Sequence, residues 1–322
     1  MRYLDVDITP RISKIGLGTW QFGSEWGYGD GYAERDAGAI VQRAIDLGVT
    51  LFDTAEIYGF GRSERILGRA LGDRRASVFL ATKLFPLLPV APVVEQRAVA
   101  SANRMGTRRL DLYQVHQANP LVRDGTTMRG MRALQTVGLV GEVGVSNYSL
   151  DRWRAAEQAL GGRVLSNQVE YSLVHRQPEA DLLPHAEAGG RMVIAYSPLG
   201  QGLLGGHYDR DHRPRNRIRA GNPLFLPENV DRAGELLGVL REVAAAHDSS
   251  PAQVALAWAI QHPAVAAIPG ASSLEQLESN VAAADLELAA GESAALRAAA
   301  DRFQPITGRS AIPKLIRARR RR

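Results

Sequence analysis

TLFDTAEIYGFGRSERILGRALGDRRASVFLATK, residues 50–83, holds a strand, a helix and a second strand in succession. Apolar runs open and close the segment, and between them apolar residues recur at three- and four-residue steps over 62–72. Recurrence at that step predicts a helix, whereas short apolar runs bounded by turn residues predict buried strands. The segment therefore predicts a β-α-β unit, which implies a parallel sheet with a right-handed crossover.

The same alternation continues to residue 269 of the 322-residue chain. Helical patterns separate eight expected strands, at residues 14–19, 50–55, 78–83, 110–116, 142–147, 166–171, 192–198 and 265–269. No Pro/Ser-rich linker marks a domain boundary, so a single domain over 1–322 is expected. Eight such units predict an α/β fold, a closed (β/α)8 TIM barrel, with a long loop at 199–226 after strand seven and a C-terminal extension.

Composition narrows the possible function classes. Cysteine is absent, which excludes a disulfide scaffold and a thiol nucleophile. The net charge of +5 is accounted for by five arginines in the basic tail RARRRR (317–322), so no basic face for nucleic acid is expected. No signal-like apolar segment opens the sequence, and no uncharged stretch is long enough for a membrane span. We therefore expect a cytoplasmic protein with neither nucleic-acid nor membrane partners.

Polar residues stand where three consecutive expected strands end. Asp53 and Tyr58 follow the second strand, Lys83 ends the third and His116 ends the fourth. Intervals of 30 and 33 residues separate Asp53, Lys83 and His116, about one β-α unit each. Barrel active sites are built at the carboxyl ends of the strands, so these side chains are expected to share one rim. Lys83 is also one of three lysines among 39 basic residues, and an ammonium has an adjustable pKa.

These four residue types can together deliver a proton from a phenol. A free tyrosine, with a pKa of about 10, is a weak acid near neutrality. The ammonium of Lys83 is expected to lower the pKa of Tyr58, and the Asp53 carboxylate to keep that ammonium charged and in place. The His116 imidazole can orient a substrate carbonyl while Tyr58 protonates its oxygen. Each residue alone is more typical of a cap, a packed ring or a solvated strand end, so the prediction depends on all four.

Three motifs carry these residues, FDTAEIYG (52–59), ATK (81–83) and DLYQVH (111–116). They resemble the catalytic signatures of the aldo-keto reductases, in a bacterial branch similar to the β-subunits of voltage-gated potassium channels. The resemblance runs from GLGTW (16–20) to about Asn280. It implies a barrel enzyme that reduces an aldehyde or ketone, with hydride from NAD(P)H and the proton from Tyr58. The family's four catalytic residues are matched by Asp53, Tyr58, Lys83 and His116.

The resemblance also implies a nicotinamide-cofactor site. Its strand motifs GVSNYS (144–149) and NQVEYS (167–172) would hold the carboxamide, which needs the donors and acceptors that Ser, Asn and Gln supply. Its segment AYSPLGQGLL (195–204) would stack Tyr196 on the nicotinamide ring and follow the pyrophosphate. The cofactor-binding residues so implied are Gly18, Thr19, Trp20, Asp53, Ser146, Asn147, Gln168, Tyr196, Ser197, Pro198, Leu199, Gly200 and Gly202.

AIPGASSLEQLESN (267–280) is the last matching segment. From its residues it is an anion-binding helix N-terminus or a capping box of Ser272 with Glu275, and the two are compatible. The resemblance implies that this segment binds the adenosine 2′-phosphate, through Gly270, Ser272, Gln276 and Asn280. Gly270 and Gln276 stand where other branches carry basic residues, so Arg219 in the 199–226 loop is the best candidate cation. We expect NADPH as cofactor, with NADH possible.

The expected partner is a small-molecule carbonyl substrate, whose identity the sequence does not predict; nor does it predict the oligomeric state. Aromatic side chains after the first and third strands suggest an aromatic rim to the pocket, from Trp20, Phe22, Trp26, Tyr28 and Phe85. The residues expected to bind substrate are Trp20, Tyr58, Phe85 and His116.

Other functions compete with a reductase. The potassium-channel β-subunits suggest a cofactor-binding regulatory or redox-sensing subunit with little turnover. His207 and His212 share one loop, but no H-E-x-x-H motif or carboxylate cluster accompanies them, so no metal site is expected. A glycosidase-type carboxylate pair would leave Lys83 and the amide-rich motifs unexplained.

Overall fold

The computed structural model describes residues 1–23, 34–209, 212–214 and 217–320. Eight strands form one parallel sheet in the order of the chain, as a (β/α)8 barrel requires. Each lies within a few residues of its predicted segment, which confirms the predicted fold. The strands are β1 (Leu17–Gly18), β2 (Leu51–Asp53), β3 (Phe79–Leu84), β4 (Leu110–Val115), β5 (Val140–Ser146), β6 (Ser166–Glu170), β7 (Met192–Tyr196) and β8 (Val265–Ala267).

Backbone hydrogen bonds join β8 to the segment that leads into β1. Gly16 N donates to Ala267 O at 2.8 Å, and Ala267 N donates to Lys14 O, also at 2.8 Å. Gly18 N donates to Pro269 O at 3.3 Å. A Cβ at Gly18 would lie 2.7 Å from Ile268 O, so only glycine permits this approach. The sheet is thereby closed into a barrel.

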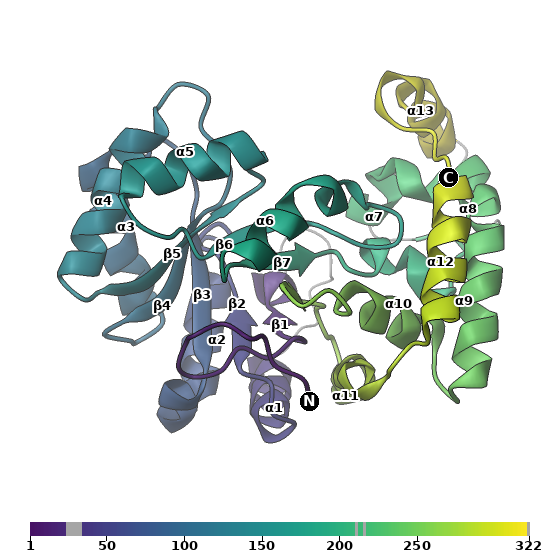
Figure 1. Cartoon of the computed structure of the whole chain (residues 1–322), viewed down its shortest axis with the longest axis horizontal. Helices are drawn as coiled ribbons and strands as arrows, with labels where there is room; N and C mark the ends of the chain where they lie inside the picture. The colour runs from purple at the N-terminus through teal and green to yellow at the C-terminus, as the bar shows by residue number, and fades with distance from the viewer. Residues whose placement is uncertain (24–33, 210–211, 215–216, 321–322) are drawn as a thin grey trace.

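Side chains alternate between the inside of the barrel and the helical layer. Leu51, Phe79 and Leu112 belong to an inner apolar cluster, whereas their neighbours Phe52 and Leu80 pack in the outer one with the helices. Leu4 and Ile12 join the inner cluster from an N-terminal hairpin, shown in purple in Figure 1. In that hairpin Leu4 N donates to Ile12 O at 2.8 Å.

Helices cover the outside of the sheet. Figure 1 shows α9 and α12 side by side at one end of the molecule. The α-helices are α1 (Glu34–Asp46), α2 (Arg62–Leu71), α3 (Ala91–Arg104), α4 (Asp124–Thr136), α5 (Leu150–Leu160), α6 (Leu182–Ala188), α7 (Arg217–Gly221), α8 (Pro227–Arg232), α9 (Gly234–Ala246), α10 (Pro251–Ala259), α11 (Leu274–Ala282), α12 (Ala290–Arg302) and α13 (Ile312–Arg320). The 3₁₀ helices are η1 (Trp20–Gly23), η2 (Gly72–Ser77), η3 (Gln177–Ala180), η4 (Gly200–Gly205), η5 (Pro223–Phe225), η6 (Ala283–Asp285) and η7 (Gly308–Ser310).

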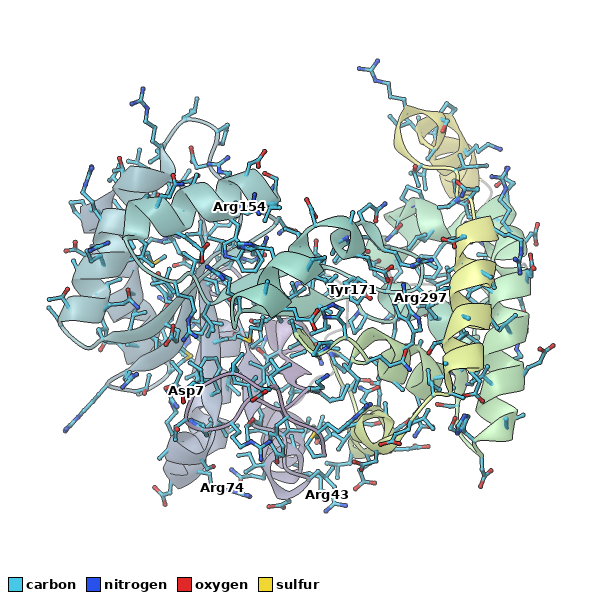
Figure 2. The ribbon with its side chains drawn as sticks, viewed as in Figure 1. Asp7, Arg43, Arg74, Arg154, Tyr171 and Arg297 are labelled. Carbon is cyan, nitrogen blue, oxygen red and sulfur yellow. The ribbon has the colours of Figure 1, made fainter. Side chains whose placement is uncertain are left out.

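A mixed aromatic and ionic contact attaches α12 to the barrel. The Tyr171 ring, just after β6, stacks on Trp258 of α10 with centroids 5.4 Å apart. The Arg297 guanidinium of α12 lies 5.3 Å from the Trp258 ring centroid, and it donates to Glu179 at 2.6 Å. Figure 2 labels Tyr171 and Arg297 at this junction.

Two segments are more ordered than the sequence predicts. The 199–226 segment, predicted as one long loop, contains η4, α7 and η5, and α13 extends into the basic tail as far as Arg320. Lys314 of α13 donates to Glu228 of α8 at 2.5 Å, which ties the C-terminal helix to the body of the protein. No helix within the described ranges has the length and apolar character to cross a membrane.

Candidate active site

Strand parity brings the predicted polar residues together. Asp53 follows the inward-facing Leu51 by two residues, and Lys83 follows the inward-facing Ala81 by two. Asp53 pairs with Ala81 in the β2–β3 register, and Lys83 pairs with Gln114 in the β3–β4 register. Both charged side chains therefore enter the barrel at the carboxyl ends of their strands.

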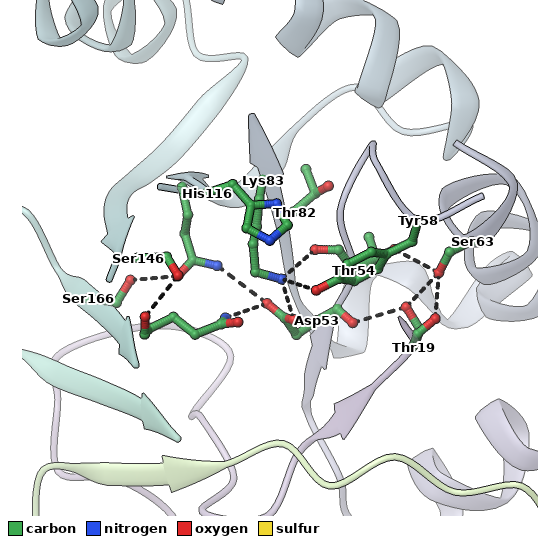
Figure 3. A network of polar contacts seen from close by, with 12 residues as sticks. Thr19, Asp53, Thr54, Tyr58, Ser63, Thr82, Lys83, His116, Ser146 and Ser166 are labelled. Atoms are coloured by element: carbon green, nitrogen blue, oxygen red, sulfur yellow. Dashed lines mark hydrogen bonds and ion pairs between the residues drawn. The ribbon is translucent and has the colours of Figure 1, made fainter. Parts of the chain in front are cut away.

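Lys83 is completely buried and has three oxygen partners. Its Nζ lies 2.6 Å from Asp53 Oδ1, 2.8 Å from Thr54 O and 3.4 Å from Tyr58 Oη (Figure 3). Burial is the largest single effect on the pKa of Lys83 and lowers it, but the effects of Asp53 and Tyr58 together are larger, so the net shift is upward. The lysine is thus held as an ammonium against the tyrosine hydroxyl.

Tyr58 differs in one respect from the sequence prediction. Burial raises its pKa above the ordinary value of 10, and the opposing effect of Lys83 is the smaller of the two. Lys83 lowers the pKa of Tyr58 as predicted, but burial, which the sequence does not show, has the larger effect, so the net shift is upward. A phenol with a raised pKa remains protonated at neutral pH and keeps its proton available for transfer.

His116 lies beside Tyr58, with the two ring centroids 5.9 Å apart and the rings edge to face. Burial, and then the charge on Lys83, lower the pKa of His116 from 6.5 to about 3. The imidazole is therefore neutral at physiological pH. Its Nδ1 is buried and has no hydrogen-bond partner among the described residues.

Two glutamines fix the far side of the Asp53 carboxylate. Gln168 Nε2 donates to Asp53 Oδ2 at 2.8 Å, and Gln114 Nε2 donates to the same oxygen at 3.3 Å. Ser166 Oγ in turn donates to Gln114 Oε1 at 3.2 Å (Figure 3). Gln114 was not among the predicted site residues, although it lies inside the motif DLYQVH. Its position two residues before His116 puts it on the inward-facing side of the expected strand, but only the β3–β4 register places it opposite Lys83.

A cavity of about 580 Å³ opens above this network. Tyr196 lies at its wall, where its hydroxyl donates to Asn147 Oδ1 at 3.0 Å, and Asn147 Nδ2 donates to Ser146 Oγ at 3.1 Å. Asn147 and Ser197 have positive φ angles of 59° and 48°. Such backbone strain clusters at functional sites.

The cavity wall contains most of the predicted cofactor and catalytic residues. Those that line it are Gly18, Thr19, Trp20, Asp53, Tyr58, His116, Ser146, Asn147, Gln168, Tyr196, Ser197, Pro198, Leu199, Gly202, Arg219, Gly270, Ser272 and Gln276. Lining residues that the sequence analysis missed are Gln21, Gln117, Gln201, Ile268, Pro269 and Ala271.

Four predicted residues lie outside the wall. Lys83 is buried beneath it, and Gly200 is buried within η4. Asn280 donates from Nδ2 to Gly270 O at 3.2 Å, so it supports the 270 turn from behind. Phe85 packs edge-on against His116 with centroids 6.5 Å apart. Of the remaining rim residues, Phe22 is buried, and Trp26 and Tyr28 lie outside the described residues.

The helix beside the cavity starts one residue later than the capping-box prediction. Ser273, and not Ser272, is the N-cap of α11, and its side chain accepts from Gln276 N at 3.1 Å. Ser272 instead donates from both its backbone N and its hydroxyl to Gln276 Oε1, at 2.8 and 2.9 Å. The result is a turn with small polar side chains at a helix N-terminus, the kind of site that favours anions.

Arg219 of α7 reaches the cavity from the 199–226 loop. Its Nη1 donates to Tyr208 Oη at 3.1 Å, and the Tyr208 ring packs edge-on against Phe225 with centroids 5.1 Å apart. No Lys, and no Arg other than Arg219, is among the described residues that line the cavity. The arrangement suits a long ligand with a flat polar ring at the Tyr196 end and an anionic group at the Arg219 end. Across the described part of the chain, no group of three or more potential metal ligands lies together.

Comparison with known proteins agrees with this geometry. The model of the aldo/keto reductase family matches residues 14–301. The chain belongs to the aldo-keto reductase family. It is 59% identical over 311 residues to an uncharacterized oxidoreductase of Mycobacterium tuberculosis, with 96% of each chain covered.

Two further aldo-keto reductase relatives are informative. The chain is 34% identical to methylglyoxal reductase YeaE of Escherichia coli, over 88% of this chain and 90% of the relative. A crystal structure of an aldo-keto reductase from Klebsiella pneumoniae in complex with NADPH matches it with a TM-score of 0.74 and 30% identity, covering 96% of this chain and 97% of that chain. The chain therefore shares the (β/α)8 barrel of this oxidoreductase family over nearly its whole length.

Proposed function

We propose that the protein is an NADPH-dependent reductase that converts an aldehyde or ketone to an alcohol. The observation that carries the proposal is the hydrogen-bonded series Asp53–Lys83–Tyr58, which ends beside a neutral His116 on the wall of the cavity. A phenol held against a buried ammonium is suited to giving a proton to a reacting oxygen and to being stabilised as phenolate afterwards.

The residues present fit a nicotinamide dinucleotide. Ser146, Asn147 and Gln168 would hold the carboxamide, and Tyr196 would face the nicotinamide ring. Ser197 to Gly202 would follow the pyrophosphate, while Arg219 with Ser272 and Gln276 would hold the 2′-phosphate. When bound, this cofactor supplies the hydride that a carbonyl reduction needs.

The chain's own residues would orient and protonate the substrate. His116 is neutral, so its ring can donate one hydrogen bond to a carbonyl oxygen without a charge in the pocket. Tyr58 would pass its proton to that oxygen, and Lys83 would stabilise the resulting phenolate. Asp53 would keep Lys83 charged throughout, since Gln114 and Gln168 hold its second oxygen in place.

The test is the consumption of NADPH and, separately, of NADH by the purified protein with a panel of aldehydes and ketones. Turnover with NADPH, and slower turnover with NADH at equal concentration, is the expected result. Tight NADPH binding without turnover of any carbonyl would contradict the proposal and favour a cofactor-binding sensor. Equal rates with both cofactors would keep the reductase and remove the preference for NADPH.

A further inference from the structure

The loop FPLLPV (85–90) between β3 and α3 exposes apolar side chains where loops usually carry polar ones. Leu87 is 70% exposed and Leu88 is 59% exposed. Leu121, in the loop that follows β4, is 91% exposed. The two loop segments 85–90 and 117–122 together contain no charged residue. We call Phe85, Leu87, Leu88 and Leu121 the apolar ledge.

The backbone of Leu88 is in the left-handed region, with φ of 50°. Bulky residues are rare there, and glycine or asparagine would adopt the same conformation with less strain. An exposed leucine at this position is therefore unfavourable twice, through its hydration and through its backbone. Neither cost is explained by packing in the fold, because most of the side chain faces solvent.

The loop is nevertheless held rigidly by side chains from other elements. Glu56 accepts a hydrogen bond from Phe85 N, and Arg97 donates to Phe85 O at 2.9 Å. Arg97 Nε also donates to Glu56 Oε2 at 3.0 Å. The Glu56–Arg97 ion pair therefore binds both the N–H and the C=O group of Phe85. Asn119 Nδ2 donates to Pro86 O at 2.8 Å and Thr127 Oγ1 donates to Pro89 O at 2.8 Å. A loop fixed at so many points presents its leucines in one geometry.

The ledge begins at the candidate active site, and none of its four residues is among those that line the cofactor cavity. Phe85 packs edge-on against His116, the residue proposed to orient the carbonyl. The ledge continues along the loops after β3 and β4, whereas the cavity wall is formed mainly by loops after β1 and after β5 to β8. A molecule with its carbonyl at His116 would thus have the apolar side chains of the ledge beside it, outside the cofactor cavity.

We propose that the apolar ledge binds the hydrocarbon portion of the substrate, so that this reductase takes carbonyl compounds with an extended, uncharged aliphatic or aryl tail in preference to small polar ones. The inference rests on the function proposed above and adds a substrate class to it. Each added methylene that contacts preorganised apolar side chains makes the free energy of binding more favourable. A short polar substrate does not reach the exposed leucines and gains no binding energy from them.

The experiment is a chain-length series of unbranched aldehydes from propanal to decanal, with kcat/KM measured at saturating NADPH. We expect kcat/KM to rise roughly twofold for each methylene that reaches the ledge. This corresponds to about half the free energy gained when a methylene is fully buried, because one side of the tail stays in water. In Leu87→Ser and Leu88→Gly the ratio of kcat/KM for decanal to that for propanal should fall at least tenfold. Glycine accepts the φ of Leu88, so Leu88→Gly is expected to fold.

Val137→Ser is the matched control. Val137 is 75% exposed and follows α4, before β5, at the end of the barrel opposite the strand carboxyl ends. Its replacement should change neither rate nor chain-length dependence. Sedimentation of all four proteins adds a second control, since an altered oligomeric state in the leucine variants would show that the ledge joins copies of the chain and would overturn the proposal.

The outcomes separate the two proposals. Turnover with a kcat/KM that is flat along the series, or a chain-length dependence that survives in both leucine variants, overturns the ledge and leaves the reductase standing. No turnover of any carbonyl contradicts the reductase instead. In that case the ledge is tested by calorimetric titration with decanol and propanol. Equal affinities for the two alcohols would overturn the ledge. Decanol that binds more tightly than propanol, and more weakly to Leu87→Ser than to the wild type, would support it.

Discussion

The Lys83 ammonium lies 2.6 Å from Asp53 Oδ1, and both side chains are shielded from solvent. Removing two charges from water is unfavourable, and only close pairing with additional hydrogen bonds offsets it. Thr54 O supplies one such bond to the lysine, and Gln168 and Gln114 supply two to the aspartate. The pair is therefore a structural element as well as the proposed support for Tyr58.

Removing both halves of this pair should destabilise the fold by less than the sum of the two single removals. Lys83→Met leaves an uncompensated buried carboxylate, so we expect a loss of about 3 kcal/mol or more in the free energy of unfolding. Combined with Asp53→Asn, the loss should be smaller than the sum of the two single losses. Urea denaturation of the three variants measures this. Glu235→Gln, which breaks the exposed pair with Arg302, is the control and should have little effect; additive losses at Asp53 and Lys83 would contradict the coupling.

Tyr58→Phe should abolish carbonyl reduction while cofactor affinity stays nearly unchanged. The variant removes the hydroxyl proposed as the proton donor and keeps the ring beside His116. General acid catalysis contributes roughly 10² to 10⁴ in rate, so kcat should fall by at least a hundredfold. Single-turnover rates and NADPH fluorescence titration measure the two quantities separately. A rate close to that of the wild type would rule out Tyr58 as the acid.

Strand periodicity predicts much of this site because it is a property of sequence. One β-α unit separates Asp53 from Lys83 and another separates Lys83 from His116, so their meeting at one rim follows from the barrel topology. Gln114 shows what periodicity leaves out. Only the β3–β4 register, which places it opposite Lys83, distinguishes it from an ordinary strand residue.

Quantities that depend on burial were not predictable. The raised pKa of Tyr58 comes from burial in the folded protein, which the sequence does not show. The rarity of lysine was a useful signal, since each of the three has a defined acceptor. Lys14 donates to Ile260 O at 2.9 Å, just beyond α10, and Lys314 pairs with Glu228. The apolar ledge, by contrast, required the exposure and backbone angle of Leu88, neither of which its letter in the sequence reveals.

His116 should make the folded state sensitive to acid. Its pKa is about 3 in the folded protein and 6.5 in the unfolded chain, so between these values the unfolded chain binds a proton that the folded one does not. The free energy of unfolding therefore falls as the pH drops below 6.5, and His116 should account for about 2 kcal/mol of that fall at pH 5. His116→Gln removes the ionisable group, so its loss of stability between pH 7.5 and pH 5 should be smaller by that amount. Urea midpoints at the two pH values measure this, and identical losses would contradict the assignment.

Arg219 should decide between NADPH and NADH. It is the one Arg or Lys among the described residues on the cavity wall, and Tyr208 Oη holds its guanidinium. If it binds the 2′-phosphate, Arg219→Gln removes a charge-assisted contact of about 1.5 to 3 kcal/mol, which raises the Kd for NADPH roughly ten- to a hundredfold and leaves that for NADH nearly unchanged. Fluorescence titration with both cofactors measures the two values.

Tyr208→Phe sharpens the Arg219 test, because it keeps the arginine and removes only the hydroxyl that positions it. Its effect on the Kd for NADPH should be in the same direction and smaller, within about tenfold. Arg241→Gln, at an exposed arginine of α9 outside the cavity wall, should alter neither Kd. An equal rise in both dissociation constants for Arg219→Gln would place the guanidinium on the pyrophosphate shared by the two cofactors. The preference for NADPH would then have to come from the turn at 270–276 alone.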